Sequence, residues 1–483
     1  MDFLNGLNNA PANMVSSGQA SMNDVEALNK ALSAGYGTDV AGLTGGAALR
    51  VQSLDKTLMS VIQDNKHFVL FNKLPKPKAD ATVDEWTEQS GIGGFLGGSS
   101  NSELGIIKDA TGQYARRVGF VKYLMTKRQV SLVQTLQGSI TEAETVEQQN
   151  GAKQLLTDAE FLCFEGDSSV VPTEFDGIVA QIVSLDSADH VIDAEGESLS
   201  SISAVVNGAA TIGGYGNFGT ATDLLVSPKT GADLDFNLDP AYRVVLPNGQ
   251  EAKRGTPVRG IVTAQGDIAL NRDVFIRDEE MQIPFQLRKG EHAKIAANNA
   301  FVPVSVTVDA TATDTSSKFA AKHAGNYYYA VAGVNADGQS VIVKSEQVAV
   351  TAGKKIVLTI TASTAGTETG YVIYRSRLNG TNETGDFREM CRIPKAGATT
   401  TYTDLNREIP GTTKSYILNM SPSDNSITWR QLLPMLKFPL ATVNQAVIPW
   451  AQLMFGYLRM AKRQHHVVIK NIVPSGARWK PFG

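Results

Sequence analysis

The chain is poor in cysteine and in charge. Only two cysteines, Cys163 and Cys391, occur among 483 residues, which argues against a disulfide scaffold and favours a reducing compartment. Charged residues make up 19%, below the roughly 25% of an ordinary soluble domain. So few charges over this length indicate that surface is buried somewhere, for example against partner chains. The net charge of −4 argues against a general nucleic-acid coat.

The sequence also lacks signals for secretion and for membrane insertion. Residues 1–20 contain neither a cationic side chain nor an apolar block. Residues 438–458 carry no charge, but they include two prolines, a glycine and three side-chain amides, which would be costly in lipid. We therefore expect this stretch to be buried protein interior.

Motifs of catalysis and metal binding are missing as well. The six histidines have no partners at metal-ligand spacing, and no G-x-S-x-G, H-E-x-x-H or calcium loop occurs. Residues 214–219, GYGNFG, spell a dinucleotide-binding fingerprint, yet a predicted helix precedes them and a predicted strand follows, so we interpret them as a turn. Both cysteines are expected to act as small buried hydrophobes. We expect no enzyme activity, no cofactor and no metal.

The first part of the chain predicts an arm and a projecting hairpin. Residues 1–60 are rich in Gly, Ala, Asn and Ser, like a flexible arm that is held against another surface. Residues 80–130 combine an acidic limb, a glycine-rich tip at 91–102 and a basic return at 114–128. Such a hairpin has little core of its own, so it needs another surface to lie on.

A long helix follows the hairpin. It is predicted to begin near Thr141, where Thr141-Glu142-Ala143-Glu144 matches a capping box, and to end near Phe164. Residues 168–298 then predict mixed α/β structure. The expected elements are a helix at 199–211, a strand at 223–228, a helix from Lys229, and strands near 259–264 and 273–277.

Residues 299–412 change character, because short strand-like runs alternate with turn residues. This pattern is typical of a β-sandwich and predicts a separate domain. The runs are 302–308, 327–334, 341–350, 355–360, 371–376, 388–393 and 399–404. Residues 413–483 return to a mixed style, with strands expected near 452–461 and 465–473.

Opposite charges gather in neighbouring segments. Residues 110–141 hold five bases and no acid, whereas residues 142–176 hold nine acids and one base. The two sets can pair within one chain or form a repeated contact between identical chains. The candidates for a contact between subunits are Arg116, Arg117, Lys122, Lys127, Arg128, Glu142, Glu144 and Glu147.

The end of the chain is one-sided in charge. From Asn425 onward there is no acid, and eight bases occur. They are either balanced by acids elsewhere in the fold or face nucleic acid, although no aromatic platform of the kind that binds single strands is interleaved with them. The candidates for a surface that faces the lumen and DNA are Lys462, Arg463 and Lys470.

This order of segments resembles the major capsid protein of tailed bacteriophages, the Hong Kong 97-type fold. The likeness covers residues 1–298 and 413–483. Its most similar segments are TEAETVEQQNGAKQLLTDAEFLCFEGD (141–167), ATDLLVSPKTGADLD (221–235), LLPMLKFPLA and HHVVIKNI.

The resemblance implies an α+β fold with seven consecutive parts. These are an N-terminal arm (1–60), an extended loop with flanking strands (61–135), a peripheral domain with the spine helix (136–185), the first part of an axial domain (186–298), an inserted all-β sandwich (299–412), the axial return (413–451) and C-terminal peripheral strands (452–483). Residues 324–340 and 370–376 resemble immunoglobulin-like or fibronectin-type strands, but in the reverse of the fibronectin order. We therefore expect an immunoglobulin-like insertion, permuted or merely similar, on the outer shell surface.

The resemblance also implies a function, that of a structural protein without turnover. It would assemble with itself, as hexamers and pentamers, into the icosahedral head shell around double-stranded DNA, which it would touch non-specifically. Scaffolding, portal and cement proteins would be further partners, no membrane would be involved, and assembly would take place in the host bacterial cytoplasm to give a virion component. The alternatives are an encapsulin-like protein compartment, a virion surface protein whose sandwich binds carbohydrate, and an enzyme with a composite site.

Overall fold

The computed structural model describes residues 64–136, 142–185, 188–199, 202–236, 258–288, 300–442 and 445–482. The predicted N-terminal arm, 1–60, lies outside these ranges. All elements below belong to the compact unit of residues 62–137 and 142–483. None of the helices described in it is long and apolar enough to cross a membrane.

The long helix α6 spans Ala143–Glu165 and confirms the helix predicted from the apolar spacing. Its N-cap is Glu142, one residue later than the predicted capping box placed it, and no side chain caps the first turn. The buried residues cluster in its second half, where Leu155, Ala159 and Cys163 point into the protein. The N-terminal half of the helix is therefore largely exposed to solvent, whereas its C-terminal half is buried in the core.

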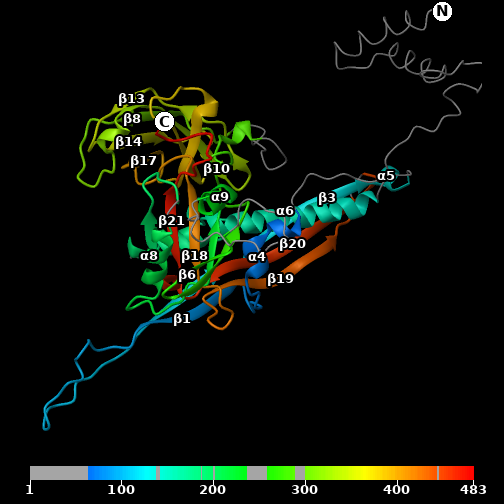
Figure 1. Ribbon diagram of the computed structural model, residues 1–483. Helices are drawn as coiled ribbons and strands as arrows, with labels where there is room; N and C mark the ends of the chain where they lie inside the picture. Colours follow the sequence, from blue (N-terminus) through cyan, green and yellow to red (C-terminus); the bar gives the residue numbers. More distant parts are fainter. Residues whose placement is uncertain are drawn as a thin grey trace, which may run out of the picture. The chain divides into compact units, whose positions relative to one another are not determined.

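A three-stranded antiparallel sheet lies beside this helix (Figure 1). Its strands, in spatial order, are β19 (Ile427–Pro439), β20 (Val447–Met460) and β3 (Lys122–Ser131). At Gly151 a side chain would come within 2.1 Å of Gln452 Oε1, so this glycine allows α6 to lie close to β20. The predicted domain boundary between residues 451 and 452 falls inside β20, and the division into peripheral and axial parts stays a prediction.

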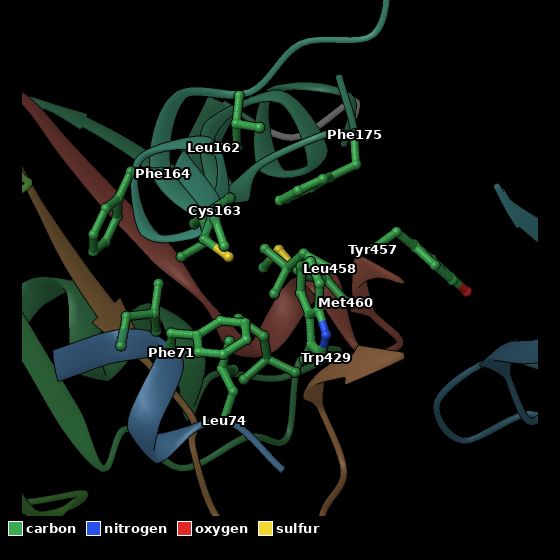
Figure 2. Close-up of a cluster of buried hydrophobic side chains, with 14 of the residues drawn as sticks. Phe71, Leu74, Leu162, Cys163, Phe164, Phe175, Trp429, Tyr457, Leu458 and Met460 are labelled. Carbon is green, nitrogen blue, oxygen red and sulfur yellow. The ribbon is translucent and has the colours of Figure 1, made fainter. Parts of the chain in front are cut away.

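The first hydrophobic core joins α6, this sheet and the short helix α4 (Val69–Lys73). Figure 2 shows Phe71 and Leu74 facing Cys163 and Trp429 across the cluster. The Phe71 and Phe175 rings meet Trp429 edge-on, with centroids 5.2 Å away in both cases. The core therefore brings together segments more than 350 residues apart in sequence, counted from Phe71 to Trp429.

Within this core, Glu160 on α6 is fully buried. Its carboxylate accepts hydrogen bonds from the backbone N–H groups of Leu70 and Phe71, both 2.7 Å long, and so holds the start of α4. Burial and, next, the neighbouring carboxylate of Asp273 together raise the pKa of Glu160 to about 9. Burial likewise raises the pKa of Asp273. The pair therefore retains a proton at neutral pH.

A six-stranded mixed sheet forms the second part of the fold. Its strands, in spatial order, are β4 (Val191–Asp193), β21 (Val467–Ile472), β18 (Thr413–Leu418), β5 (Asp223–Val226), β7 (Gly266–Arg272) and β6 (Gly260–Thr263). The other helices of this part are α7 (Ile178–Val183), α8 (Ser203–Ile212) and α9 (Pro228–Phe236). The strand expected at 273–277 is wrong, because β7 ends at Arg272 and Asp273 leaves the sheet to meet Glu160. β21, expected in the peripheral part, pairs instead with β18 of the axial return.

Residues 300–412 are rich in strands that share one core. One sheet has the order β17 (Thr399–Asp404), β14 (Ile356–Thr361), β8 (Ser305–Asp309). The other contains β11 (Gly338–Gln339), β10 (Tyr329–Asn335), β15 (Gly370–Ser376) and β16 (Phe387–Pro394), with β12 (Val343–Lys344) also paired to β10. β13 (Val348–Val350) pairs with β9 (Gly325–Tyr327). The run expected at 341–350 is thus two short strands, and the immunoglobulin-like character of this unit stays a prediction.

The predicted hairpin consists of β1 (Val83–Gly91) and β2 (Gln113–Phe120). They pair in antiparallel register from Val83 opposite Phe120 to Gln89 opposite Tyr114. The basic return at 114–128 is not one strand, because Val121 separates β2 from β3 and turns the chain into the three-stranded sheet. A short helix, α5 (Leu132–Leu136), follows β3.

Candidate assembly interface

The loop of the hairpin, residues 92–112, exposes large apolar side chains. Leu104 is 97% exposed and Phe95 is 71% exposed. The others in the loop are Ile92, Leu96, Ile106 and Ile107. An exposed apolar cluster on a hairpin without its own core is typical of a surface that another protein covers.

The hairpin is fixed at its base by Asp84. Its carboxylate accepts hydrogen bonds from Arg430 Nε at 2.9 Å and from the Tyr457 hydroxyl at 2.7 Å, and Arg459 lies 3.5 Å away. Partial burial would raise the pKa of Asp84, but these hydrogen bonds and the charges of both arginines outweigh it and hold the pKa below its ordinary value. Because Arg430 is on β19 and Tyr457 on β20, one carboxylate ties the hairpin to two strands of the sheet.

A second contact lies beside the Asp84 clamp, the name used here for Asp84 with Arg430, Tyr457 and Arg459. Glu88 of β1 is 2.9 Å from Arg117 of β2 and 3.9 Å from Arg463. On the same side, a side chain at Gly119 would come within 2.3 Å of the Tyr457 ring, so the strand can approach the ring closely only with glycine there. Two predicted candidates from different groups, Arg117 and Arg463, are therefore brought to one carboxylate at the base of the hairpin.

The three-stranded sheet has one covered face and one open face. Lys437 and Gln452 face α6, where Lys437 pairs with Glu144 at 2.6 Å and Gln452 donates to the Gln148 carbonyl. Side chains of the opposite face include Tyr123, Met125, Leu436 and Phe438, and between 47% and 62% of each is exposed. The expectation that residues 438–458 are all buried is wrong at Phe438 and Ile448, which are exposed. The open face therefore exposes apolar side chains to solvent. The backbone of the central strand β20 is nevertheless hydrogen-bonded to a strand on each side.

Most candidates for contact between subunits have partners in their own chain. Arg116 lies 3.4 Å from Glu85, Arg128 lies 3.2 Å from Glu147, and Lys122 donates to the Pro172 carbonyl. Glu142 accepts from the Thr145 hydroxyl, and Lys127 is exposed on β3. Of the two possibilities in the sequence, the structure thus contains the pairing within the chain. A contact of these residues with a second subunit stays a prediction.

The basic C-terminal residues also pair with acids elsewhere in the fold. Lys462 lies 3.6 Å from Asp424, and Lys470 donates to Glu408. Arg463 also donates to the Ser184 hydroxyl at 2.9 Å. The one-sided charge from Asn425 onward is therefore largely balanced by carboxylates that precede it in sequence. A role of Lys462, Arg463 and Lys470 in facing DNA stays a prediction.

One cavity in the described part of the chain is lined by charged side chains that pair with one another. A cavity of about 320 Å³ lies where α6, β16 and β21 meet. The charges around it are paired: Arg277 with Glu389 at 2.8 Å, Lys414 with Glu165 at 2.8 Å, and Lys470 with Glu408. Burial raises the pKa of the Cys163 thiol, so it is not a nucleophile at neutral pH. Among the described residues, no group of three His, Cys, Asp or Glu side chains could hold a metal ion.

Two parts of the interface were not found from the sequence. Asp84 lies in an acidic limb with no local partner, and its partners on β19 and β20 come more than 340 residues later. The open sheet face combines β3 with β19, which are also far apart in sequence. One signal in the sequence could have indicated the open face. Tyr123, Met125 and Lys127 are spaced two residues apart, so in a strand they lie on the same side.

Comparison with known proteins shows what this chain is similar to. No family model matches the chain. Among sequence relatives, the putative major capsid protein of Enterococcus phage phiEF24C is 27% identical and aligns over 92% of this chain and 95% of its own length. The major capsid protein of Staphylococcus phage S25-3 is 25% identical with the same coverage, and so is that of Staphylococcus phage K.

Solved structures with a similar fold include the capsid of the native GTA particle, with a TM-score of 0.48, 9% identity, and coverage of 90% of this chain and 99% of that one. The capsid of Myoviridae phage XM1 gives 0.42, 8% identity, and coverage of 87% and 96%. The SrpI encapsulin complex of Synechococcus elongatus gives 0.40, 7% identity, and coverage of 87% and 94%. TM-scores below 0.5 are too low to carry the assignment, which rests on the sequence relatives. Their alignment over nearly the whole chain confirms the prediction from the sequence: the chain is a homologue of the major capsid proteins of tailed bacteriophages, and its role is structural and not enzymatic.

Proposed function

We propose that this chain is the main subunit of an icosahedral phage head, that it assembles with copies of itself as hexamers and pentamers, and that the shell encloses double-stranded DNA. The observation that carries the proposal is the pair of exposed apolar surfaces in one chain, the hairpin loop and the open sheet face. Its sequence relatives are capsid proteins, and large apolar side chains of both surfaces stay exposed in the described part of the chain.

The two surfaces fit one kind of contact, in which the hairpin loop of one subunit covers the open sheet face of the next. Burial of a large apolar side chain contributes about 1.5 to 3 kcal/mol, so several such side chains per subunit can stabilise a shell through many equal contacts. A hairpin that leaves its own domain to lie on a neighbour is a heterologous contact, which repeats around a ring and closes it. Apolar burial, more than the charge complementarity predicted from the sequence, therefore drives this contact.

The Asp84 clamp orients the hairpin relative to the three-stranded sheet. Because one carboxylate holds β1 to both β19 and β20, the hairpin leaves the sheet at a fixed angle. A ring closes only if every hairpin leaves at nearly the same angle, since an angular error accumulates around the symmetry axis. The clamp is therefore a positioning element for assembly.

Other partners belong to the same proposal at a finer level. Scaffolding, portal and cement proteins would be further partners of the shell. Packaged DNA would be touched non-specifically, with Lys462, Arg463 and Lys470 as the candidate residues. The strand-rich unit of residues 299–412 would lie on the outer surface as an immunoglobulin-like insertion.

The test is expression of the full chain followed by negative-stain electron microscopy across a salt series. We expect closed shells or rings from the wild type, and the double substitution Phe95→Ser/Leu104→Ser should reduce their yield by about tenfold or more. Val304→Ser is the matched control, because Val304 is also exposed but lies on the strand-rich unit. Shells of unchanged yield from the double variant would rule out the loop as the contact.

The contents of the shells separate the remaining alternatives. Nuclease-sensitive contents of particles from infected cells support a DNA-packaging head, whereas protein cargo in the absence of DNA supports an encapsulin-like compartment. Charge reversal at Arg116 and Arg117 tests the ionic contact predicted from the sequence. Unchanged assembly of that variant would count against any inter-subunit role of these two residues.

A further inference from the structure

Another cavity in the described part of the chain lies at the base of the hairpin. It measures about 180 Å³ and is lined by residues of β1, β2, β20 and α7, among others. Water takes about 30 Å³ per molecule in the liquid, so the cavity has room for several water molecules or for one small ion. The hairpin loop and the open sheet face are other surfaces, and the contact proposed for them leaves this cavity without a role.

Three cations from separate elements line the cavity. Arg117 belongs to β2, Lys122 begins β3, and Arg463 begins the short 3₁₀ helix η8 (Arg463–His465). Two carboxylates of the described chain accompany them. Glu88 lies 2.9 Å from Arg117 and 3.9 Å from Arg463, and Asp176 lines the cavity itself. Three positive charges against two negative ones leave one positive charge uncompensated.

The neighbouring Asp84 clamp adds to this excess of positive charge, because Asp84 alone faces both Arg430 and Arg459. Within the cavity, burial and next the charge of Arg117 lower the pKa of Arg463, although Glu88 raises it. A guanidinium nevertheless keeps its proton in a protein, so two like charges stay close together. An anion between them would replace this repulsion by attraction.

Hydrogen-bond donors are available around the cavity. Arg117 Nε donates to Glu88 and Arg463 Nη1 donates to Ser184, but a guanidinium has five N–H groups, so each arginine keeps further donors. Trp86 also lines the cavity, and its buried indole N–H has no acceptor among the described residues. Buried donors are nearly always satisfied, so this one indicates a ligand that accepts hydrogen bonds.

We propose that this cavity binds a small phosphate-type oxyanion, with Arg117, Lys122 and Arg463 as its cationic ligands. Guanidinium groups bind phosphate through paired N–H donors. The three cations come from separate elements, which suits the four oxygens of a tetrahedral ion better than the two coplanar oxygens of a carboxylate. The Arg463 side chain is only 14% exposed, so the site favours a free ion over the phosphates of a DNA duplex.

A bound ion would join the hairpin to the rest of the fold. Arg117 lies on the hairpin, whereas Arg463 follows β20, so one ion between them bridges both parts. Together with the Asp84 clamp, it would hold the hairpin at its base by two contacts. All of these residues belong to one chain, so the inference does not rest on the proposed shell.

The test is titration calorimetry of inorganic phosphate into the unassembled full chain, at neutral pH and constant ionic strength. We expect one saturable site, and a higher thermal unfolding midpoint in phosphate than in chloride, since a ligand of the folded state stabilises it. Arg463→Gln should weaken phosphate binding about tenfold or more, and Arg463→Lys should weaken it less, because it keeps the charge but not the paired donors. Lys127→Gln is the matched control, because it removes a cation from an exposed position of β3 and should leave the affinity unchanged.

A second variant covers the case that Arg463→Gln unfolds. Trp86→Phe keeps an aromatic ring and removes only the N–H, so it should weaken phosphate binding without lowering the midpoint in chloride. Absence of saturable binding to the wild type, or equal affinity in the wild type and both variants, would overturn the inference.

Two further probes decide between phosphate and other occupants. A short DNA duplex and a glutamate-rich peptide are titrated in the same buffer. Binding of either one, lost in Arg463→Gln and without binding of inorganic phosphate, would make the cavity a contact for nucleic acid or for an acidic protein, and the inference would be wrong. Shell assembly is measured separately, so failure of phosphate binding leaves the proposed function standing.

Discussion

Arg116 and Arg375 each lie beside a carboxylate from another strand, but their surroundings differ completely. Arg116 of the hairpin is 74% exposed and 3.4 Å from Glu85, which is 49% exposed. Arg375 on β15 is fully buried and donates to Asp404 on β17 at 2.6 Å and to Asn406 at 2.8 Å. Water and salt screen the first pair, whereas the second joins the two sheets of the strand-rich unit through its core. Burial, and not the presence of an arginine and an acid, thus decides which pair matters for stability.

The buried network has further members that the hairpin pair lacks. The Tyr329 hydroxyl also donates to Asp404, at 2.8 Å, and the Arg375 guanidinium lies over the Tyr327 ring at 5.2 Å. Burial would lower the pKa of Arg375, but the charge of Asp404 outweighs this and raises it above its ordinary value, so the charge persists. The exposed pair has no such support. Substitutions in the buried network are therefore expected to lower the free energy of unfolding most, and substitutions in the exposed hairpin pair least.

The largest effect is expected at Arg375. Arg375→Met should lower the free energy of unfolding by about 3 to 5 kcal/mol, because it leaves Asp404 charged, buried and without its partner. Urea unfolding of the unassembled full chain measures this. The double variant Arg375→Met/Asp404→Leu is the control, and it should lose less than the single one, since no charge is then left buried alone. If Arg375→Met lowered the free energy of unfolding by less than about 1 kcal/mol, burial would not explain the difference between the Arg375 and Arg116 pairs.

A pH effect is expected at Glu160, where two buried acids meet instead of an acid and a base. The folded-state pKa of about 9 lies above the ordinary value of 4.5, so the folded chain binds a proton that the unfolded chain has released. The stability that this proton provides is fully present below about pH 4.5 and is lost as the pH rises to about 9. Unfolding free energies measured across this window should fall with pH.

The matched variant for this effect is Asp273→Asn. It removes the neighbouring carboxylate, so the pKa of Glu160 should fall and the decline of stability with pH should become shallower than in the wild type. The same slope in both proteins would mean that Glu160 and Asp273 do not share the proton.

A smaller effect is expected at Asp84, which lies between the two extremes of exposure. Asp84→Asn should cost about 1 to 3 kcal/mol, because Arg430, Arg459 and Tyr457 lose their charged acceptor. The pKa of Asp84 is lowered in the folded state, so its contribution is present above the ordinary value of 3.8 and is lost as the pH falls through the folded value. Urea unfolding at neutral and acid pH tests both statements, with Glu85→Gln on the exposed side of the same strand as control.

The smallest effect is expected at Arg116. Arg116→Ala should change the free energy of unfolding by less than about 0.5 kcal/mol, because an exposed pair gains little in water and is screened by salt. The measurement is urea unfolding at low and high salt. A change as large as that of Arg375→Met would remove burial as the explanation of the difference between the two regions.

Elements that depend on local patterns were predictable. Helix α6 has the predicted extent within a few residues, and the hairpin exists with a shorter return limb than predicted, since helical spacing and glycine-rich turns are local properties. The strands β14, β15 and β17 were likewise visible as short runs of strand-favouring residues. The strand expected at 273–277 failed, because the residue pattern favoured a strand while Asp273 is needed in the core beside Glu160.

The candidate interface was only half predictable. The sequence predicted that the hairpin needs another surface, because its tip is rich in glycine and lacks a core, and this stays a prediction. It gave no means to choose between pairing within the chain and pairing between chains for Arg117 or Arg128, since the acids that could pair with them lie in separate segments. In the structure, Arg117 meets Glu88 across the hairpin and Arg128 meets Glu147 on α6.

By itself, the sequence determined the kind of protein: segment order, hydrophobic periodicity, scarcity of charge and missing catalytic motifs are all properties of the chain read in order. Only the tertiary structure decided which charges are paired and which side of the sheet is open. The physical reason is distance along the chain, since Asp84 and Arg430 are 346 residues apart and become partners only when the sheet forms. Burial and pairing are properties of that arrangement, and they set the free energy of each charge.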